Sequence, residues 1–234
     1  MNLNRTVTIK INWVLDNLIP PVLRDNRYFM YPLIWLLFRG KTRVVMDFKS
    51  SAHDLDSRQI RDIYLETQSA HMQRETDLNQ ASIDLVLDYL QGQSVLDIAC
   101  GSGHLCRLIA KKKPALKVVG ADFIAPTSDE LEYHNVNITA TPFTDKQFDT
   151  VISAHTLEHI IDFEEALKEL RRICRSRLII VLPRQREYRY TYDLHVHFFP
   201  YNYSVLQKLK PVVPYELTLC GGDWVYVETY DLEQ

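Results

Sequence analysis

The segment V-L-D-I-A-C-G-S-G-H-L, residues 95–105, constrains the fold of this chain more than any other. Residues 95–98 are an apolar strand, the next residues hold Gly101 and Gly103, and a helix is expected over 105–113. Glycines let the backbone turn tightly and approach a ligand, and the following helix presents its N-terminus there. The segment lacks the third glycine of a dinucleotide fingerprint. It therefore predicts a ligand site at a strand–turn–helix unit that does not bind a dinucleotide.

The remaining pattern predicts an α/β fold with a Rossmann-like, mostly parallel sheet, because strands alternate with helices. Further strands are expected over 118–121, 136–139, 149–152 and 178–182, and helices over 163–173 and 203–209. Two late strands, 215–219 and 224–229, predict an antiparallel hairpin at the sheet edge through residues 221–223. These elements place the α/β domain in residues 91–234.

Residues 1–90 predict a helical N-terminal extension that also serves as a lid over the ligand. Helices are expected over 11–23 and 28–38, interrupted by Pro20-Pro21 and by Pro32. Another helix is expected to begin near Ser57, which would cap it, and a further one at a cap formed by Asp77.

Composition excludes several classes of protein. Hydrophobic residues make up 46% of the chain, which argues against disorder, and a net charge of −3 does not favour nucleic acid as a partner. The four cysteines form no C-x-x-C pair, and no apolar run reaches the roughly 20 residues of a spanning helix. We therefore expect a cytoplasmic protein with reduced thiols.

The first fifty residues differ in character from the rest. They hold eight Lys and Arg against three Asp, a balance of +5, and an apolar aromatic run over 28–38 lies between Arg27 and Arg39. Basic residues beside such a run are typical of a peripheral membrane contact. The alternatives are packing against the α/β domain or a homodimer contact.

Three motifs in order resemble the class I S-adenosylmethionine-dependent methyltransferases. Asp97 precedes the glycine turn, a second strand ends in Gly120-Ala121-Asp122, and T-P-F-T-D-K-Q-F-D leads to a fourth strand that ends before L-E-H at 157–159. The resemblance is to the methyltransferase type 11, ubiquinone-biosynthesis-like branch, and covers about residues 95–183. The chain also resembles small methyltransferases of bacterial surface-polysaccharide pathways.

This resemblance implies S-adenosylmethionine as the cofactor and assigns residues to its parts. The glycine turn would pack against the amino-acid part of the cofactor, and Asp122 would bind the ribose. Phe123 and residues 139–141 would lie near the adenine, and residues 154–157 near the methionine end. Because His155 stands where related metal-binding enzymes have an acid, no metal is expected. The implied cofactor-binding residues are Asp97, Ala99, Gly101, Gly103, Asp122, Phe123, Thr141, His155, Arg74 and Tyr64.

The short stretch from Asp122 to Pro142 departs from the family. It leaves room for only a turn or two of the usual helix between the second and third strands, which would open the adenine pocket.

The segment L-P-R-Q-R-E-Y-R-Y-T-Y-D-L-H-V-H, 182–197, follows the strand after which related enzymes bind their substrates. Arginines pair with phosphate or carboxylate, and tyrosines stack on rings. We predict substrate contacts from Arg184, Arg186, Tyr190 and Tyr192. In an extended strand Asp193, His195 and His197 would share one face. His195 or His197, with His155 as a further candidate, would be the catalytic general base; the alternative is a polar surface loop.

The predicted function is methyl transfer to the oxygen of a saccharide, phosphorylated or lipid-linked acceptor. Two alternatives stay open: a quinone-like or small aromatic acceptor, and a non-catalytic module that binds the cofactor without turnover.

Overall fold

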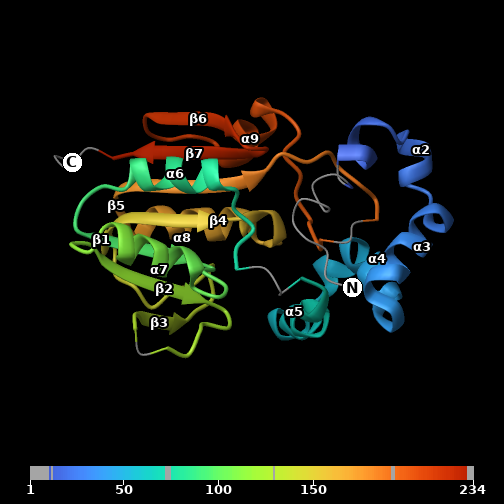
Figure 1. Ribbon diagram of the computed structural model, residues 1–234, viewed down its shortest axis with the longest axis horizontal. Coiled ribbons are helices and arrows are strands. Elements are labelled where there is room, and N and C mark those ends of the chain that lie inside the picture. Colours follow the sequence, from blue (N-terminus) through green and yellow to red (C-terminus); the bar gives the residue numbers. More distant parts are fainter. Residues whose placement is uncertain (1–10, 12, 72–74, 129, 191–192, 231–234) are drawn as a thin grey trace. The chain divides into compact units, whose positions relative to one another are not determined.

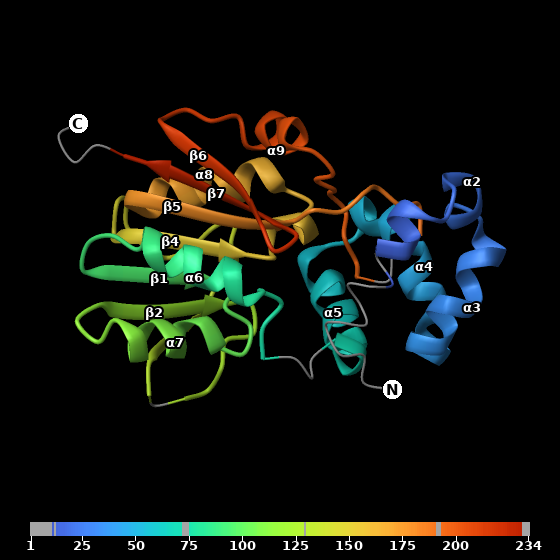
Figure 2. The ribbon, with the colours of Figure 1, turned by 45° about the horizontal axis from the view of Figure 1, so that its top comes forward.

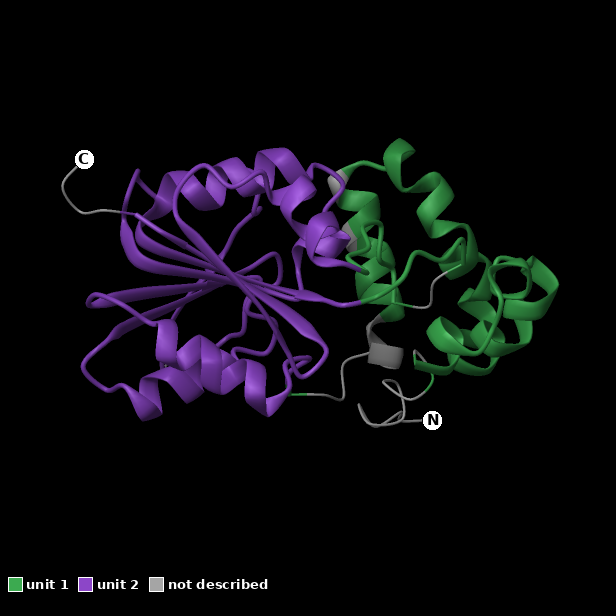
Figure 3. Cartoon of the chain, turned by 90° about the horizontal axis from the view of Figure 1, so that it is seen from above, with its two compact units in different colours: residues 1–75, 185–200 green, residues 76–184, 201–234 purple. Residues whose placement is uncertain are grey.

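The computed structural model describes the chain except residues 1–10, 12, 72–74, 129, 191–192 and 231–234 (Figure 1). It divides into two compact units, and each is described by itself (Figure 3). The N-terminal unit comprises residues 1–75 and 185–200, and the sheet unit comprises 76–184 and 201–234.

These limits differ from the predicted boundary at residue 90. Helix α6 (Gln80–Tyr89) buries Ile83 and Val86 in the same core cluster as the central strands, so it belongs to the sheet unit. The segment 185–200 returns to the N-terminal unit, where the Tyr188 hydroxyl donates to Asp16 and Lys49 Nζ lies 2.6 Å from Glu187 Oε1. Such contacts between distant segments leave no local signal in the sequence.

The sheet unit contains a seven-stranded sheet in the order β3-β2-β1-β4-β5-β7-β6. Strand β1 pairs in parallel with β2 and β4, whereas β7 runs antiparallel to both β5 and β6. The predicted fold class and edge hairpin are thus confirmed. The strands are β1 (Ser94–Ile98), β2 (Lys117–Asp122), β3 (Glu132–Asn135), β4 (Phe148–Ala154), β5 (Cys174–Pro183), β6 (Tyr215–Cys220) and β7 (Asp223–Thr229).

Helices cover both faces of this sheet (Figures 1 and 3). On one face, α6 and α7 (His104–Lys112) share a core cluster with β1, β4, β5 and β7. On the other face, α8 (Phe163–Ile173) packs on β4 and β5 through an apolar stripe that includes Phe163, Leu167 and Leu170. Helix α9 (Asn202–Leu209) leads to the hairpin.

The predicted third strand, 136–139, is wrong. The observed strand β3 pairs Tyr133 with Gly120, and Val136 follows its end, where its N–H donates to the Asp122 carbonyl. Val136 and Ile138 are buried, which explains their β-like pattern, but Ile138 lies in a turn closed by a bridge between Asn137 and Ala140, and Val136 directly precedes that turn. Among the described residues between β2 and β3 no helix forms, which is a stronger shortening than the turn or two expected.

The N-terminal unit is helical: α2 (Pro21–Arg24), α3 (Arg27–Phe38), α4 (Thr42–Ser51) and α5 (Ser57–His71), with short 3₁₀ turns at Arg39–Lys41 and Ala52–Asp54. None of the helices in the described part of the chain is long and apolar enough to cross a membrane.

Three helix boundaries differ from the predictions. Pro32 lies inside α3 and does not end it. Asp56 caps α5 instead of Ser57, because Asp56 and Gln59 exchange backbone-to-side-chain hydrogen bonds of 2.8 and 2.9 Å. Asn79 caps α6 instead of Asp77, its Oδ1 accepting from the Ser82 N–H at 2.9 Å.

Candidate functional site

The carboxyl ends of β1 and β2 meet at one edge of the sheet, where the structure joins the two predicted cofactor motifs (Figure 2). The Gly101 N–H donates to Asp122 Oδ2 at 2.9 Å, and the Ile124 N–H donates to Asp122 Oδ1 at 2.8 Å. Burial raises the pKa of Asp122, and the backbone N–H groups of Ile124, Gly101 and Phe123 oppose that rise. Each carboxylate oxygen keeps acceptor capacity for a diol at this edge.

The two glycines of the turn, Gly101 and Gly103, are required for different structural reasons. Both have positive φ, +53° at Gly101 and +75° at Gly103. A Cβ on Gly101 would meet nothing within 4 Å, so the backbone there borders open space. A Cβ on Gly103 would lie 2.4 Å from the Tyr133 hydroxyl, so Gly103 serves packing. Ala99, a predicted cofactor-binding residue, is half-buried and has φ +60°, a left-handed backbone conformation that is strained for a residue other than glycine.

Gly101→Ala tests this distinction. The added methyl group would occupy the open space at the turn, so the affinity for S-adenosylhomocysteine is expected to fall about tenfold or more in calorimetric titration. Gly222→Ala is the matched control, because Gly222 also has positive φ (+96°) and open space around its Cβ position. Both variants carry strain of about 1–2 kcal/mol. Equal loss of affinity in both would contradict a ligand role for Gly101.

Asp97 lies beneath the turn and is only 3% exposed. Burial raises its pKa to about 7, the Cys106 thiol that donates to Oδ2 at 3.3 Å opposes this, and the Asp122 charge adds to it. The hydrogen bond with Cys100, burial and the charge of Asp97 raise the pKa of Cys106, which keeps it a thiol. The predicted contact of Asp97 with a cofactor stays a prediction.

Thr141 is held by a partner that the sequence analysis missed. Its N–H and hydroxyl both donate to Glu169 Oε1, at 2.7 and 2.6 Å. Arg172 Nε lies 2.7 Å from Glu169 Oε2 and lowers the pKa of Glu169 to about 2; burial opposes this and Thr141 adds to it. The available signal was the acid and base three residues apart on α8.

An open pocket of about 470 Å³ is lined by residues of the connection between β2 and β3 and of β3 itself. Its lining begins two residues after the 41% exposed Phe123. The expectation that the short connection opens an adenine pocket stays a prediction. The pocket is lined by Ala125, Pro126, Thr127, Ser128, Tyr133 and Asn135.

His155, directly after β4, lies between two buried carboxylates. Its Nδ1 is 3.5 Å from Glu158 Oε1, and its Nε2 is 3.3 Å from Asp223 Oδ1. Asp223 Oδ2 also accepts from Asn79 Nδ2 at 2.7 Å and from Ser82 Oγ at 3.0 Å. This network connects the ends of β4 and β7 with the first turn of α6.

The network argues against the predicted general-base role of His155, which stays a prediction. Burial alone would lower the pKa of His155, but the nearby carboxylates of Asp223 and Glu158 outweigh it and raise the pKa to about 10. At neutral pH the ring already holds both protons and cannot accept another. Its predicted cofactor contact stays a prediction. The sequence singled out Glu158 by its motif, whereas Asp223 was recognised only as a turn residue.

The other two histidines predicted as catalytic lie in the N-terminal unit. His195 is buried, its Nδ1 donates to Gln185 Oε1 at 2.6 Å, and Asp193 Oδ2 lies 3.5 Å from the same nitrogen. A proton on Nδ1 leaves Nε2 as the basic nitrogen, as a general base requires. His197 is half-buried nearby in the chain. Both roles stay predictions.

The extended strand expected over these residues is absent. The described part of 184–200 is irregular, and Leu194 has φ +55°, which breaks the alternation on which the shared face of Asp193, His195 and His197 depended. No sequence pattern marked Gln185, whose Nε2 donates to Asp193 Oδ2 at 3.1 Å.

The predicted substrate residues are not gathered in one unit. Arg184 belongs to the sheet unit and is exposed, and Arg186 is exposed in the N-terminal unit. Tyr190 is only 8% exposed, with the Arg189 guanidinium 5.5 Å from its ring. Tyr64 packs edge-on against Phe48 within the N-terminal unit. The predicted residues Arg74 and Tyr192 lie outside the described residues.

Comparison with known proteins supports the resemblance. Residues 96–182 match the family described as "Methyltransferase domain". The chain is 32% identical over 103 residues to the demethylmenaquinone methyltransferase of Thermus thermophilus, covering 39% of this chain and 46% of that protein. It is 35% identical over 106 residues to the ubiquinone/menaquinone biosynthesis C-methyltransferase of Hahella chejuensis, covering 38% and 43%.

The matches to these curated relatives span less than half of their length. A solved structure from Aquifex aeolicus, a SAM dependent methyltransferase, shares the fold with a TM-score of 0.52 and 16% identity, covering 74% of this chain and 97% of that one. Residues 96–182 are thus a methyltransferase domain, and the predicted family resemblance and fold are confirmed.

Proposed function

We propose that this chain, which carries a class I S-adenosylmethionine-dependent methyltransferase domain, transfers a methyl group to a small acceptor at the carboxyl edge of its sheet. The observation that carries the proposal is the hydrogen bond between the Gly101 N–H and the Asp122 carboxylate, which fixes both cofactor motifs at that edge. S-adenosylmethionine supplies an already activated methyl group, so the protein mainly aligns the reactants and excludes water.

The residues present fit this cofactor. Asp122 offers the ribose hydroxyls a fixed carboxylate, and Gly101 borders open space that a longer side chain would fill. Phe123 is exposed beside Asp122, where a ring can stack on the adenine.

A quinone-like aromatic ring is the acceptor class we favour. The relatives from Thermus and Hahella are named as quinone methyltransferases. In addition, Tyr190, a predicted substrate contact, is only 8% exposed. This side chain lacks the exposure that a saccharide-binding surface needs.

A saccharide, phosphorylated or lipid-linked acceptor is the second candidate. The exposed guanidinium groups of Arg184 and Arg186 favour it, because arginine pairs with phosphate through two parallel hydrogen bonds. The chain would then methylate an oxygen, with His195 or His197 as the base.

Two measurements test the proposal. Calorimetric titration with S-adenosylhomocysteine is expected to give micromolar binding. Methyl transfer from S-adenosylmethionine is then measured by mass spectrometry with reduced demethylated naphthoquinones and benzoquinones, and with saccharides and sugar phosphates. We expect turnover of a quinol at least about tenfold above the other acceptors. Faster turnover of sugar acceptors would reverse the order of the candidates, and cofactor binding without any turnover would favour a binding module.

A further inference from the structure

Helix α3 has an apolar face that the described residues of its own unit leave exposed. It buries Met30, Ile34 and Phe38 at four-residue spacing. On its other sides Tyr28 is 88% exposed and Trp35 is 50% exposed, and Tyr31, Leu33 and Leu36 are exposed as well. Apart from Arg27 the helix has no charged residue, so its outer face is as apolar as its inner one. A helix that is apolar all round is normally buried or in contact with lipid.

The neighbouring helices of the N-terminal unit extend this apolar surface. Val22 is 77% exposed in α2; Trp13, in the helical residues before it, and Leu18, in the turn that follows those residues, are also exposed. These exposed fractions are for the whole chain, so the same side chains are at least as exposed on the N-terminal unit taken alone. Several exposed large apolar side chains on neighbouring helices of one unit are typical of an interaction site.

Uncompensated positive charge directly follows the helix. Arg24, Arg27, Lys41 and Lys49 each lie within 4.0 Å of an acidic group, respectively Asp16, Asp47, Glu66 and Glu187. Arg39 and Arg43 are exposed, and among the described residues neither has an acidic partner at ion-pair distance. Arg39 directly follows the last residue of α3, and Arg43 lies in the first turn of α4. Their positive charges are complementary to an anionic surface.

We propose that the N-terminal unit docks on an anionic phospholipid bilayer through the outer face of α3, with Arg39 and Arg43 on the lipid phosphates. Tyr and Trp side chains are favoured at the level of the lipid headgroups. The helix has 12 residues, fewer than the roughly 20 that span a bilayer, so it lies in the interface. This contact goes beyond methyl transfer and does not depend on it.

The test is co-sedimentation of the full chain with vesicles of phosphatidylcholine alone or with phosphatidylglycerol. Binding is expected to the anionic vesicles and to weaken in high salt. The double variant Arg39→Glu/Arg43→Glu should lower this binding about 30-fold or more, because each basic residue near an anionic surface contributes about 1 kcal/mol, or about fivefold, and the variant also adds two negative charges. Trp35→Ala should lower it about tenfold.

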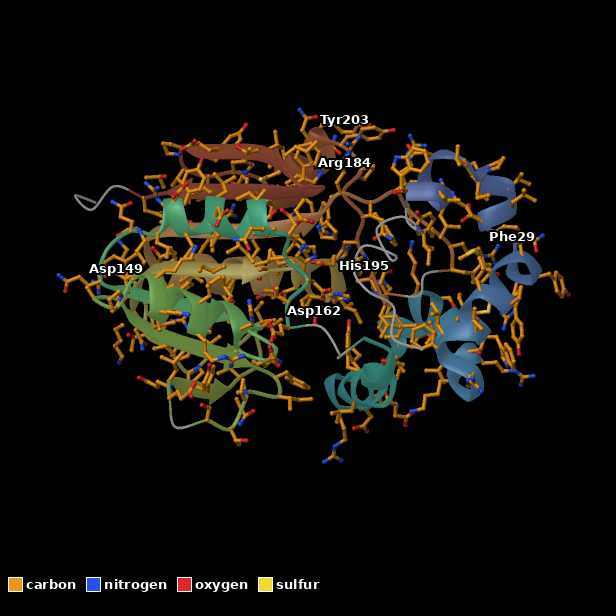
Figure 4. All side chains as sticks on the ribbon, viewed as in Figure 1. Phe29, Asp149, Asp162, Arg184, His195 and Tyr203 are labelled. Atoms are coloured by element: carbon orange, nitrogen blue, oxygen red, sulfur yellow. The ribbon has the colours of Figure 1, made fainter. Side chains whose placement is uncertain are left out.

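Two control variants make the same kinds of substitution, a double charge reversal and the loss of an exposed aromatic ring, in the sheet unit. Lys111→Glu/Lys113→Glu matches the reversed charges, and Tyr203→Ala matches the exposed aromatic ring (Figure 4). Both should bind vesicles like the wild type, and all variants should retain S-adenosylhomocysteine binding. Absence of vesicle binding by the wild type overturns the proposal. A dimer that Trp35→Ala dissociates, without vesicle binding, would instead assign the face to a second copy of the chain.

Discussion

Asp122→Ala is expected to lower the affinity for S-adenosylhomocysteine at least about 100-fold in calorimetric titration. Hydrogen bonds to a charged group are worth about 1.5–3 kcal/mol each, and 1.4 kcal/mol is a factor of ten. A ribose would lose two such bonds. The substitution also releases the N–H groups of Gly101 and Ile124, which Asp122 holds at 2.9 and 2.8 Å, so the turn itself loses its fixed position.

Asp149→Ala is the matched control for this prediction. Asp149 Oδ2 likewise accepts two backbone N–H groups, those of Gln93 and Ser94, but at the amino ends of β1 and β4 (Figure 4). Its loss should destabilise the sheet unit while the affinity for S-adenosylhomocysteine stays within about twofold of the wild type. If both variants lose affinity equally, Asp122 acts through stability alone and the assigned ribose contact is wrong.

The part of the site that could be predicted from the sequence depends on local patterns. The glycine turn could be predicted because its glycines occupy positions that need positive φ. Asp122 could be predicted because it stands at the end of a buried strand. Because β1 and β2 are parallel neighbours, their carboxyl ends must meet. Strand and helix periods therefore sufficed to place this half of the site.

The part that could not be predicted depends on contacts between distant residues. The register of β3 is decided by Tyr133, which packs against Gly120, and not by the apolar pattern of Val136 and Ile138. The protonation of His155 depends on Asp223, which lies 68 positions further along the chain. No spacing rule brings such a pair together, so nothing in the sequence alone indicated that two carboxylates lie against the ring of His155.

His155→Gln is expected to lower the free energy of unfolding by about 3–5 kcal/mol at neutral pH. Removing one partner of a buried ion pair leaves the other charge uncompensated, and here both Glu158 and Asp223 are buried. The effect should also depend on pH. Since the pKa of about 10 exceeds the ordinary 6.5, the folded chain keeps a proton that the unfolded chain releases above pH 6.5. The stabilisation is complete below about pH 6.5 and is lost as the pH rises through 10.

Urea unfolding between pH 7 and pH 10, followed by circular dichroism, measures both effects. The wild type should lose stability across this window, whereas His155→Gln should vary less because it lacks the titrating ring. His134→Gln is the control, since His134 also contacts a carboxylate, Glu132 at 2.8 Å, but is 39% exposed at the side chain. An exposed pair contributes at most about 1 kcal/mol, so this variant should follow the wild-type curve. A His155→Gln curve parallel to that of the wild type would show that His155 is neutral in the folded chain and would restore it as a candidate base.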